Sequence, residues 1–415
     1  MKNNWTTLDH AAKLFIAGES KTETQVFRFS CEFDREIDPA LLQEAVDHTM
    51  NAFPSFRVVI KKGFFWYYLE ECDLSPMVLL ETKKLCANMN CTRARKLLLE
   101  VTYFRKRVNL EVYHVLADGT GAMQFFTTML SKYSSLAFGT PMQSPDIDAS
   151  HTQRKDDSYE RYYTGETRKR AKVLPACRIQ GFKYSENFLR NITGQLPAEK
   201  VSALAKEYRT TVTGLLCAFL IHSIGVNTSS REKKKPIILS VPVDLRNHFP
   251  SASARNFFGV ISVSYQWQKE DNSIETIVRR LNPQFAEKLT VEYLNNQLDE
   301  QSAAEHNVFA KIAPLFLKQL ALKIVYKNSE KATTATISNM GRISMPEEAA
   351  KHIKSFDICA STKKFQASIC SFNGCLSIGC TNPHISSDIE RTFFRMFTER
   401  DIDVRIMSNN TEDMN

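Results

Sequence analysis

The chain has 415 residues, which is too many for one ordinary hydrophobic core, so two domains are expected. Hydrophobic residues make up 43% and charged residues 24% of the chain, which is the composition of a folded globular protein and excludes extensive disorder. The 54 Lys and Arg residues outnumber the 46 Asp and Glu residues, and the net charge of +8 is spread in short runs. A nucleic-acid-binding protein usually gathers its positive charge in a denser patch with aromatic residues, so a nucleic-acid partner is not expected.

The N-terminus and the cysteines indicate a cytoplasmic protein. Residues 1–12 lack the apolar core of a secretory signal, so the ten cysteines are expected to be free thiols. Cys370, Cys375 and Cys380 are evenly spaced, but they lie around a predicted hairpin turn where small apolar residues fit, and no metal site is expected. The longest apolar stretch, Thr211–Val226, is short for a transmembrane segment and favours a buried helix.

The first 150 residues predict a mixture of strands and helices. Asp38 and Pro39 are the residue types that favour the N-cap and first position of a helix, and apolar residues follow them at helical spacing. A second helix is expected to begin near Asp118. The expected strands of this half are Val26–Phe33, Phe56–Ile60, Phe64–Glu70, Leu97–Phe104 and Val108–His114.

The middle of the chain has no apolar periodicity. Gly139 to about Lys172 contains Pro, Ser and Asp together with a charged run, which predicts a linker or an exposed crossover. We therefore expect an N-terminal half at residues 1–150, a linker at 151–175 and a C-terminal half at 176–415.

The C-terminal half again predicts alternating strands and helices. Its expected strands are Phe182–Ile192, Pro236–Val243, Phe257–Gln266, Thr334–Ser338, Ser355–Ala360, Phe365–Phe372 and Cys375–Cys380. Helices are expected after Pro197, from Thr211 or Thr213, over Asn272–Leu298, Phe309–Tyr326 and Ser387–Phe397. The fold class is therefore α/β (α+β).

His114, Asp118 and Gly119 form the pattern His-x-x-x-Asp-Gly at the end of a predicted strand. A histidine at a strand end can face a cleft, and its near-neutral pKa suits a general base that takes a proton from an attacking hydroxyl or amine. Gly119 and Gly121 leave room for close approach of the backbone. The alternative is a packed histidine beside an aspartate that only caps a helix, and the spacing alone does not separate the two interpretations.

The second half adds Arg246, in Val241-Pro-Val-Asp-Leu-Arg246, ahead of Asn256-Phe-Phe-Gly259. With these residues the chain resembles the superfamily of chloramphenicol acetyltransferase, peptide-synthetase condensation domains, plant BAHD acyltransferases and alcohol acetyltransferases. In Thr336-Ile-Ser-Asn-Met-Gly341 and the hairpin Ser371-Phe-Asn-Gly374 the chain most resembles the bacterial alcohol acetyltransferase-like branch, and the order of elements agrees over nearly the whole chain. The paired His-His of condensation domains is absent, because Tyr113 precedes His114, and so is the plant Asp-Phe-Gly-Trp-Gly signature.

The resemblance implies two chloramphenicol acetyltransferase-like domains, each a mixed sheet flanked by helices, with the active site in a tunnel between them. It implies that His114 is the general base and that Asp118 pairs with Arg246 to hold the loop, while Gly119 gives room. Ser338 or Asn339 is the candidate oxyanion donor; the alternative is that both are turn residues at a strand end.

The expected reaction is transfer of an acetyl or other short acyl group from acyl-CoA to a small-molecule alcohol or amine. Two alternatives remain open, namely an enzyme that takes its acyl group from an acyl carrier protein and a non-catalytic binding module that keeps the fold. No metal, nucleic acid or transmembrane segment is expected. A Rossmann or P-loop enzyme is disfavoured because neither glycine motif occurs in the sequence.

Overall fold

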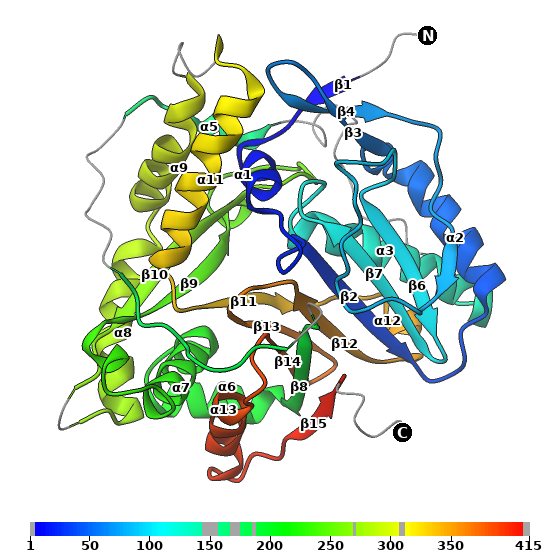
Figure 1. Ribbon diagram of the computed structural model, residues 1–415. Coiled ribbons are helices and arrows are strands. Elements are labelled where there is room, and N and C mark those ends of the chain that lie inside the picture. The colour runs from blue at the N-terminus through cyan, green and yellow to red at the C-terminus, as the bar shows by residue number, and fades with distance from the viewer. Residues whose placement is uncertain are drawn as a thin grey trace.

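The computed structural model describes residues 5–142, 157–166, 175–184, 188–268, 271–306 and 312–409. These residues form a mixed α/β protein in which each half of the chain builds a sheet covered by helices (Figure 1). The expected fold class is confirmed. Most of the expected linker, residues 151–156 and 167–174, lies outside the described residues, and the part between them contains the short helix α5 (Ser158–Tyr162).

The N-terminal half is built on a five-stranded sheet. Alternation along β2 and β7 places apolar side chains on one face, where they form a core with the helices α2 and α3. An aspartate caps each helix as the sequence predicts, Asp38 for α2 and Asp118 for α3. The strand order is β12 (Ile353–Ala360), β2 (Val26–Phe33), β7 (Arg107–Tyr113), β6 (Leu99–Phe104) and β5 (Val78–Leu80), and the helices are α2 (Pro39–Ala52) and α3 (Gly119–Phe138).

A smaller sheet and one helix complete this half. The hairpin of β3 (Val58–Lys62) and β4 (Tyr67–Glu71) was expected, whereas β1 (Trp5–Thr7), which pairs with β4, was not. The helix α1 (His10–Gly18) was also not expected. It lies beside α11 (Leu315–Lys331) of the C-terminal half (Figure 1).

The C-terminal half is built on a seven-stranded sheet with a second core. The apolar stretch after Thr211 forms the buried helix α7, with Thr211 as its N-cap, and it contacts α6, α8 and α13. The strand order is β10 (Phe258–Tyr265), β9 (Ile237–Asp244), β11 (Ala335–Arg342), β13 (Phe365–Phe372), β14 (Cys375–Asn382), β8 (Arg190–Pro197) and β15 (Arg405–Ser408). The helices are α6 (Ala198–Glu207), α7 (Val212–Val226), α8 (Ile274–Lys288), α9 (Val291–His306), α11, α12 (Glu347–Ala350) and α13 (Asp388–Thr398).

The strand β12 links the two halves. It comes from the C-terminal half of the sequence but pairs antiparallel with β2 at the edge of the N-terminal sheet, and it also contacts β13 and β14. The proposed division into residues 1–150 and 176–415 stays a prediction about domains. In space, the N-terminal core includes Phe356 and Ile358 of β12.

Two boundaries expected in the C-terminal half were wrong. The strand expected at Phe182–Ile192 lies at Arg190–Pro197 instead, because its inward positions include Arg190, whose charge is neutralised by buried Glu390 at 2.6 Å. The single helical region at Asn272–Leu298 is two helices, α8 and α9, which are separated at residues 289–290.

Within the described ranges, no single helix is long and apolar enough to cross a membrane, although α6 and α7, bent by 81° to each other, pass the same test as a pair. All ten cysteines are free thiols, and the hairpin of β13 and β14 turns at Asn373 and Gly374 with positive φ angles of 44° and 76°. The described residues hold no cluster of three or more potential metal ligands.

Candidate active site

His114 follows the last residue of β7 and lies between aromatic side chains from both halves of the protein. Its ring stacks on Phe15 of α1, with centroids 4.1 Å apart and an interplanar angle of 27°. Phe27 of β2 meets the ring edge-on at 4.8 Å, and Phe258 of β10 lies at 5.8 Å. The backbone N–H of His114 donates to the carbonyl of Gln25. The imidazole is therefore partly buried and held on several sides.

Asn256 fixes the tautomer of His114. The Asn256 amide nitrogen donates to the carboxylate of Asp9, at 3.2 and 3.3 Å, and to the carbonyl oxygen of His114 at 3.1 Å. The Asn256 oxygen therefore faces His114 Nδ1, 3.2 Å away. Because an amide oxygen only accepts, Nδ1 carries the proton and donates it. Nε2 is then the unprotonated nitrogen, which is the form that a general base needs.

The pKa of His114 is also shifted in the direction that a base requires. Burial lowers this pKa below its ordinary value, and the charge of Asp118 and the hydrogen bond to Asn256 oppose the shift without reversing it. The imidazole is consequently neutral at neutral pH and ready to accept a proton.

Asp118 joins the loop of His114 to the C-terminal half. One carboxylate oxygen accepts the N–H of Gly121 at 2.9 Å and so caps α3. The other accepts the N–H of Phe257 at 2.8 Å and lies 2.8 Å from Arg246 Nη1. The predicted contact between Asp118 and Arg246 is thus present, and the carboxylate is buried with a hydrogen bond to each of its oxygens.

Arg246 uses both edges of its guanidinium to tie down the turn that follows β9. Besides Asp118, it donates to Asp244 at 3.0 Å and to the backbone carbonyls of Ser253 and Arg255 at 2.9 and 2.6 Å. Burial alone would lower its pKa, but the two carboxylates outweigh burial and raise it, so the charge persists. A lysine could not reproduce this planar set of contacts.

The two glycines after Asp118 serve different purposes. A side-chain methyl at Gly121 would lie 2.0 Å from the backbone oxygen of Ala254, so only glycine allows α3 to approach this turn. A methyl at Gly119 would meet Met340 Sδ at 2.6 Å, which is the end of a flexible side chain. Met340 lies on β11, so this strand also reaches the motif.

Comparisons with solved structures identify the fold. No family model and no curated protein matches the chain. The first condensation domain of the calcium-dependent antibiotic synthetase, bound to a substrate analogue, has a TM-score of 0.64 at 15% identity and covers 96% of each chain. A variant of the starter condensation domain of rhizomide synthetase, in complex with C8-CoA, has a TM-score of 0.63 at 12% identity, covering 95% of this chain and 94% of that one. The trichothecene 15-O-acetyltransferase of Fusarium sporotrichioides has a TM-score of 0.61 at 10% identity, covering 96% and 97%.

The chain has an acyltransferase-type fold. The similarity extends over nearly the whole length of each chain, so both halves and their order are shared. Within this fold, Asp118 of the N-terminal motif accepts hydrogen bonds from Arg246 and from the N–H of Phe257, which both belong to the C-terminal half.

The candidate oxyanion donors lie on β11 of this acyltransferase-type fold. The amide nitrogen of Asn339 donates to Thr213 at 3.0 Å, and its oxygen accepts the N–H of Gly341. Ser338 pairs with Ser368 of β13 in register. Their strand reaches Gly119 through Met340, but their role in the reaction remains a prediction.

The expected tunnel also stays a prediction. A surface cavity of about 860 Å³ lies between α6, α8 and residues 400–402, and none of the predicted site residues lines it.

Three residues around His114 were not predicted. Asn256 was recognised as part of a motif, but nothing in the sequence assigned its amide to the imidazole. Asp9 is separated from Asn256 by 247 positions and also lies 3.5 Å from Arg255. Phe15 could have been found with its helix, since Asp9 is followed by apolar residues at helical spacing and caps α1 through Ala12 N–H.

Proposed function

We propose that the protein is an acyltransferase that moves an acetyl or other short acyl group from CoA to a small-molecule hydroxyl acceptor. The observation that carries this proposal is the imidazole of His114, whose Nδ1 proton is donated to Asn256 so that Nε2 is left as a base. The burial that lowers its pKa supports the same role. The proposal includes a cytoplasmic location, where CoA thioesters are available.

In the proposed reaction, Nε2 takes the proton of the acceptor hydroxyl as its oxygen attacks the thioester carbonyl. The C–S bond then breaks, and the imidazolium returns the proton to the departing CoA thiolate. General base catalysis of this kind contributes about 10²–10⁴-fold to the rate. Ser338 or Asn339 is proposed to donate a hydrogen bond to the tetrahedral oxyanion. Asp118 and Arg246 are positioning residues, because their contacts hold the His114 loop.

A second candidate is an enzyme that takes its acyl group from a carrier protein and acylates an amine. Its support is the fold shared with condensation domains. The donor separates the two candidates. If acyl transfer occurs from an acylated carrier protein and not from acyl-CoA, the CoA-dependent proposal is wrong.

The proposal is tested by measuring free thiol released from acetyl-CoA in the presence of a panel of alcohols and amines. We expect at least one acceptor to raise thiol release, and His114→Ala to remove this increase. His222→Gln is a matched control. His222 lies in α7, and its Nδ1 is 3.1 Å from the backbone carbonyl oxygen of Asn272, away from the His114 loop. If no acceptor or donor raises release above the His114→Ala background, catalysis by this site loses its support and the non-catalytic binding module is favoured.

A further inference from the structure

The helix α11 exposes an unusually apolar face. Phe316, Leu320 and Ile324 are four residues apart, so they form one stripe along the helix, and Leu317 lies beside it. These four side chains are 47–69% exposed, and none of them belongs to the two buried cores of the protein. An amphipathic helix of a globular protein normally turns its apolar face inward, so this orientation calls for a partner.

The opposite face of α11 is fixed to the protein by polar contacts. The N–H of Leu315 donates to the carbonyl of Phe64, and Lys318 Nζ donates to the carbonyl of Phe65 at 3.2 Å. Further along, the hydroxyl of Tyr326 accepts the Gln25 amide at 3.0 Å. The exposed stripe is therefore presented by a helix in a defined orientation.

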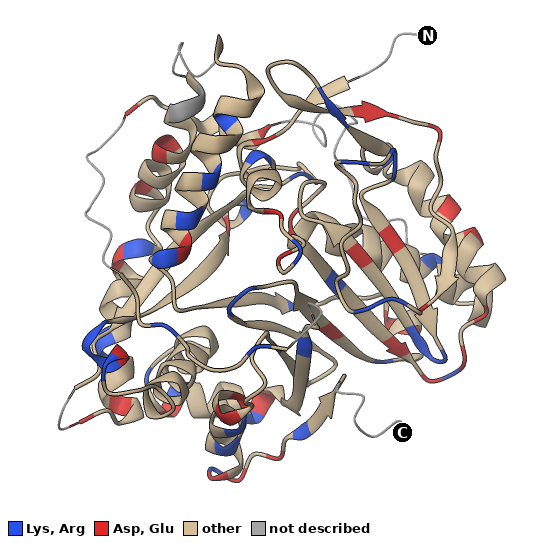
Figure 2. Ribbon diagram, viewed as in Figure 1, with Lys and Arg blue, Asp and Glu red and all other residues tan. Residues whose placement is uncertain are grey.

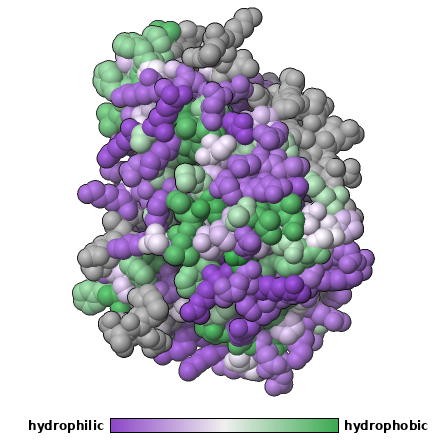
Figure 3. Space-filling model, turned by 90° about the vertical axis from the view of Figure 1, so that its right-hand side faces the viewer, coloured by the Kyte–Doolittle hydropathy of each residue, from purple (hydrophilic) through white to green (hydrophobic). Residues whose placement is uncertain are grey.

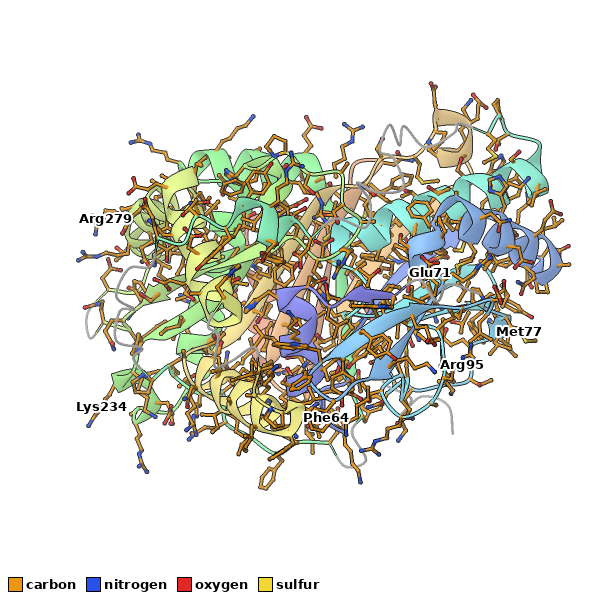
Figure 4. All side chains as sticks on the ribbon, turned by 90° about the horizontal axis from the view of Figure 1, so that it is seen from above. Phe64, Glu71, Met77, Arg95, Lys234 and Arg279 are labelled. Carbon is orange, nitrogen blue, oxygen red and sulfur yellow. The ribbon has the colours of Figure 1, made fainter. Side chains whose placement is uncertain are left out.

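The tip of the β3–β4 hairpin extends the stripe. Phe64 and Phe65 are 73% and 45% exposed, and their carbonyls are the ones that α11 contacts. Figure 4 shows Phe64 beside this helix, at the edge of the molecule. We define the α11 patch as Phe64, Phe65, Phe316, Leu317, Leu320 and Ile324.

The charge around the α11 patch is of one sign. From Leu315 to Ser329, α11 contains no Asp or Glu, and its lysines Lys323 and Lys327 are exposed, whereas Lys318 is buried on the opposite face. Lys62 adds an exposed cation next to the hairpin tip. In Figure 2 the bands along α11 are blue, with red only near its C-terminal end. Apolar side chains bordered by lysines are typical of helices that lie in the interface of an anionic membrane.

We propose that the α11 patch docks on an anionic lipid bilayer. The phenylalanines and leucines would enter the boundary between headgroups and acyl chains, while the lysines would contact the headgroup phosphates and carboxylates. A second copy of the chain fits less well, because a symmetric contact would bring the lysines of both copies together. On the side of the N-terminal half shown in Figure 3, by contrast, the hydrophobic areas are interrupted by hydrophilic residues.

Docking would place the candidate active site close to the membrane. The helix α11 packs against α1, where a methyl at Gly18 would touch the ring of Tyr326, and Phe15 of α1 stacks on His114. If the proposed reaction holds, a lipophilic alcohol dissolved in the bilayer is the acceptor class that this arrangement favours. The docking itself does not depend on the reaction.

The test is sedimentation of the full chain with vesicles of phosphatidylcholine alone or with about 30 mol % phosphatidylserine, at about 0.1 M salt. We expect binding to the anionic vesicles only. The double variant Lys323→Glu, Lys327→Glu should bind at least about twenty-five-fold more weakly, since each lysine contributes about a factor of five near such a surface. The double variant Phe316→Ser, Leu320→Ser should also lose at least tenfold in affinity.

Two control variants change the same residue types elsewhere. Phe182 is 87% exposed but lies outside the patch, so Phe182→Ser should bind like the unchanged protein. Lys234, which Figure 4 shows far from Phe64, provides Lys234→Glu. The proposal is overturned if the unchanged protein does not bind anionic vesicles, or if patch and control variants bind alike. It is also overturned if sedimentation velocity shows a dimer that the patch variants dissociate.

Because vesicle binding is measured without substrate, its loss is distinguishable from a failure of the proposed function. If the protein releases no thiol with any donor yet binds anionic vesicles through the patch, only the reaction is wrong. If it transfers acyl groups to water-soluble alcohols but ignores vesicles, only the docking is wrong.

Discussion

Replacing Arg246 by methionine tests whether the Asp118–Arg246 contact holds the His114 loop in place for the proposed reaction or only stabilises the fold. Methionine keeps an unbranched side chain but removes every donor. Asp118 then retains the N–H groups of Gly121 and Phe257 but loses its positive partner, and the carbonyls of Ser253 and Arg255 lose their donors. Removing one partner of a buried ion pair costs about 3–5 kcal/mol, and we expect a loss of this size in the free energy of unfolding.

The chain contains a matched control for this change. Arg190 pairs with buried Glu390 at 2.6 Å and donates to the backbone carbonyls of Ile385 and Ser386 at 2.5 and 2.7 Å. Arg190→Met therefore removes a similar set of contacts, with a similar loss of stability. This pair joins β8 to α13 and the segment before it, and Glu390, Ile385 and Ser386 lie outside the His114 loop.

The two variants are compared by urea denaturation and by thiol release from acetyl-CoA at a temperature where both are folded. Both should unfold at lower urea concentration, but only Arg246→Met should lower kcat, by tenfold or more, because a misplacement of about 1 Å can cost about a hundredfold. Equal kcat values for the two variants would refute the positioning role. An unchanged denaturation midpoint in Arg246→Met would refute the energetic argument itself.

The remaining predictions concern the rest of the site. The rate should be constant near neutral pH and fall below pH 6.5, the ordinary pKa of histidine, because burial lowers the pKa of His114 and protonation removes its base form. A rate that rises on acidification would contradict this sign. Asn256→Ala should lower kcat with little change in KM, because the tautomer is no longer fixed, and the acid-side fall in rate should move to lower pH, because the hydrogen bond to Asn256 raises the pKa of His114. Gly121→Ala should unfold at clearly lower urea concentration than Gly119→Ala, because its methyl would meet a backbone oxygen at 2.0 Å, whereas the other meets the end of a flexible side chain at 2.6 Å. Similar midpoints for the two glycine variants would contradict this difference.

Local patterns were sufficient for elements whose caps and alternation agree. The strand Val26–Phe33 was predicted at both ends, and α2 and α3 begin directly after the aspartates that the sequence suggested as N-caps. In each case the residues that define the element are neighbours in the sequence, so their pattern carries the information.

The misplaced strand shows where such patterns fail. Its true span begins at Arg190, and a charged residue normally indicates the surface. Arg190 is buried only because Glu390 lies 200 positions later in the chain. Phe182, which a pattern places in a core, is exposed instead. Burial of a charge depends on a distant partner, and no local pattern contains that partner.

The same limit applies to the candidate site. His114, Asp118 and Arg246 could be named from motifs, and the contact of the last two was predicted and is present. The tautomer of His114 could not be predicted, since it depends on hydrogen bonds from Asn256 to Asp9 and to His114, and Asp9 and Asn256 are 247 positions apart in the chain.

These contacts imply that the site cannot exist in either half alone. The N-terminal half supplies His114 and Asp118, but Asp118 is balanced by Arg246, and the imidazole is oriented by Asn256. Without the C-terminal half, Asp118 would lose its cation and its bond from Phe257, and His114 would lose the acceptor that sets its tautomer. The contacts that join the two halves are thus the same contacts that orient the imidazole of His114 and hold its loop. Selection for the proposed reaction at His114 would therefore also preserve the residues that join the two halves.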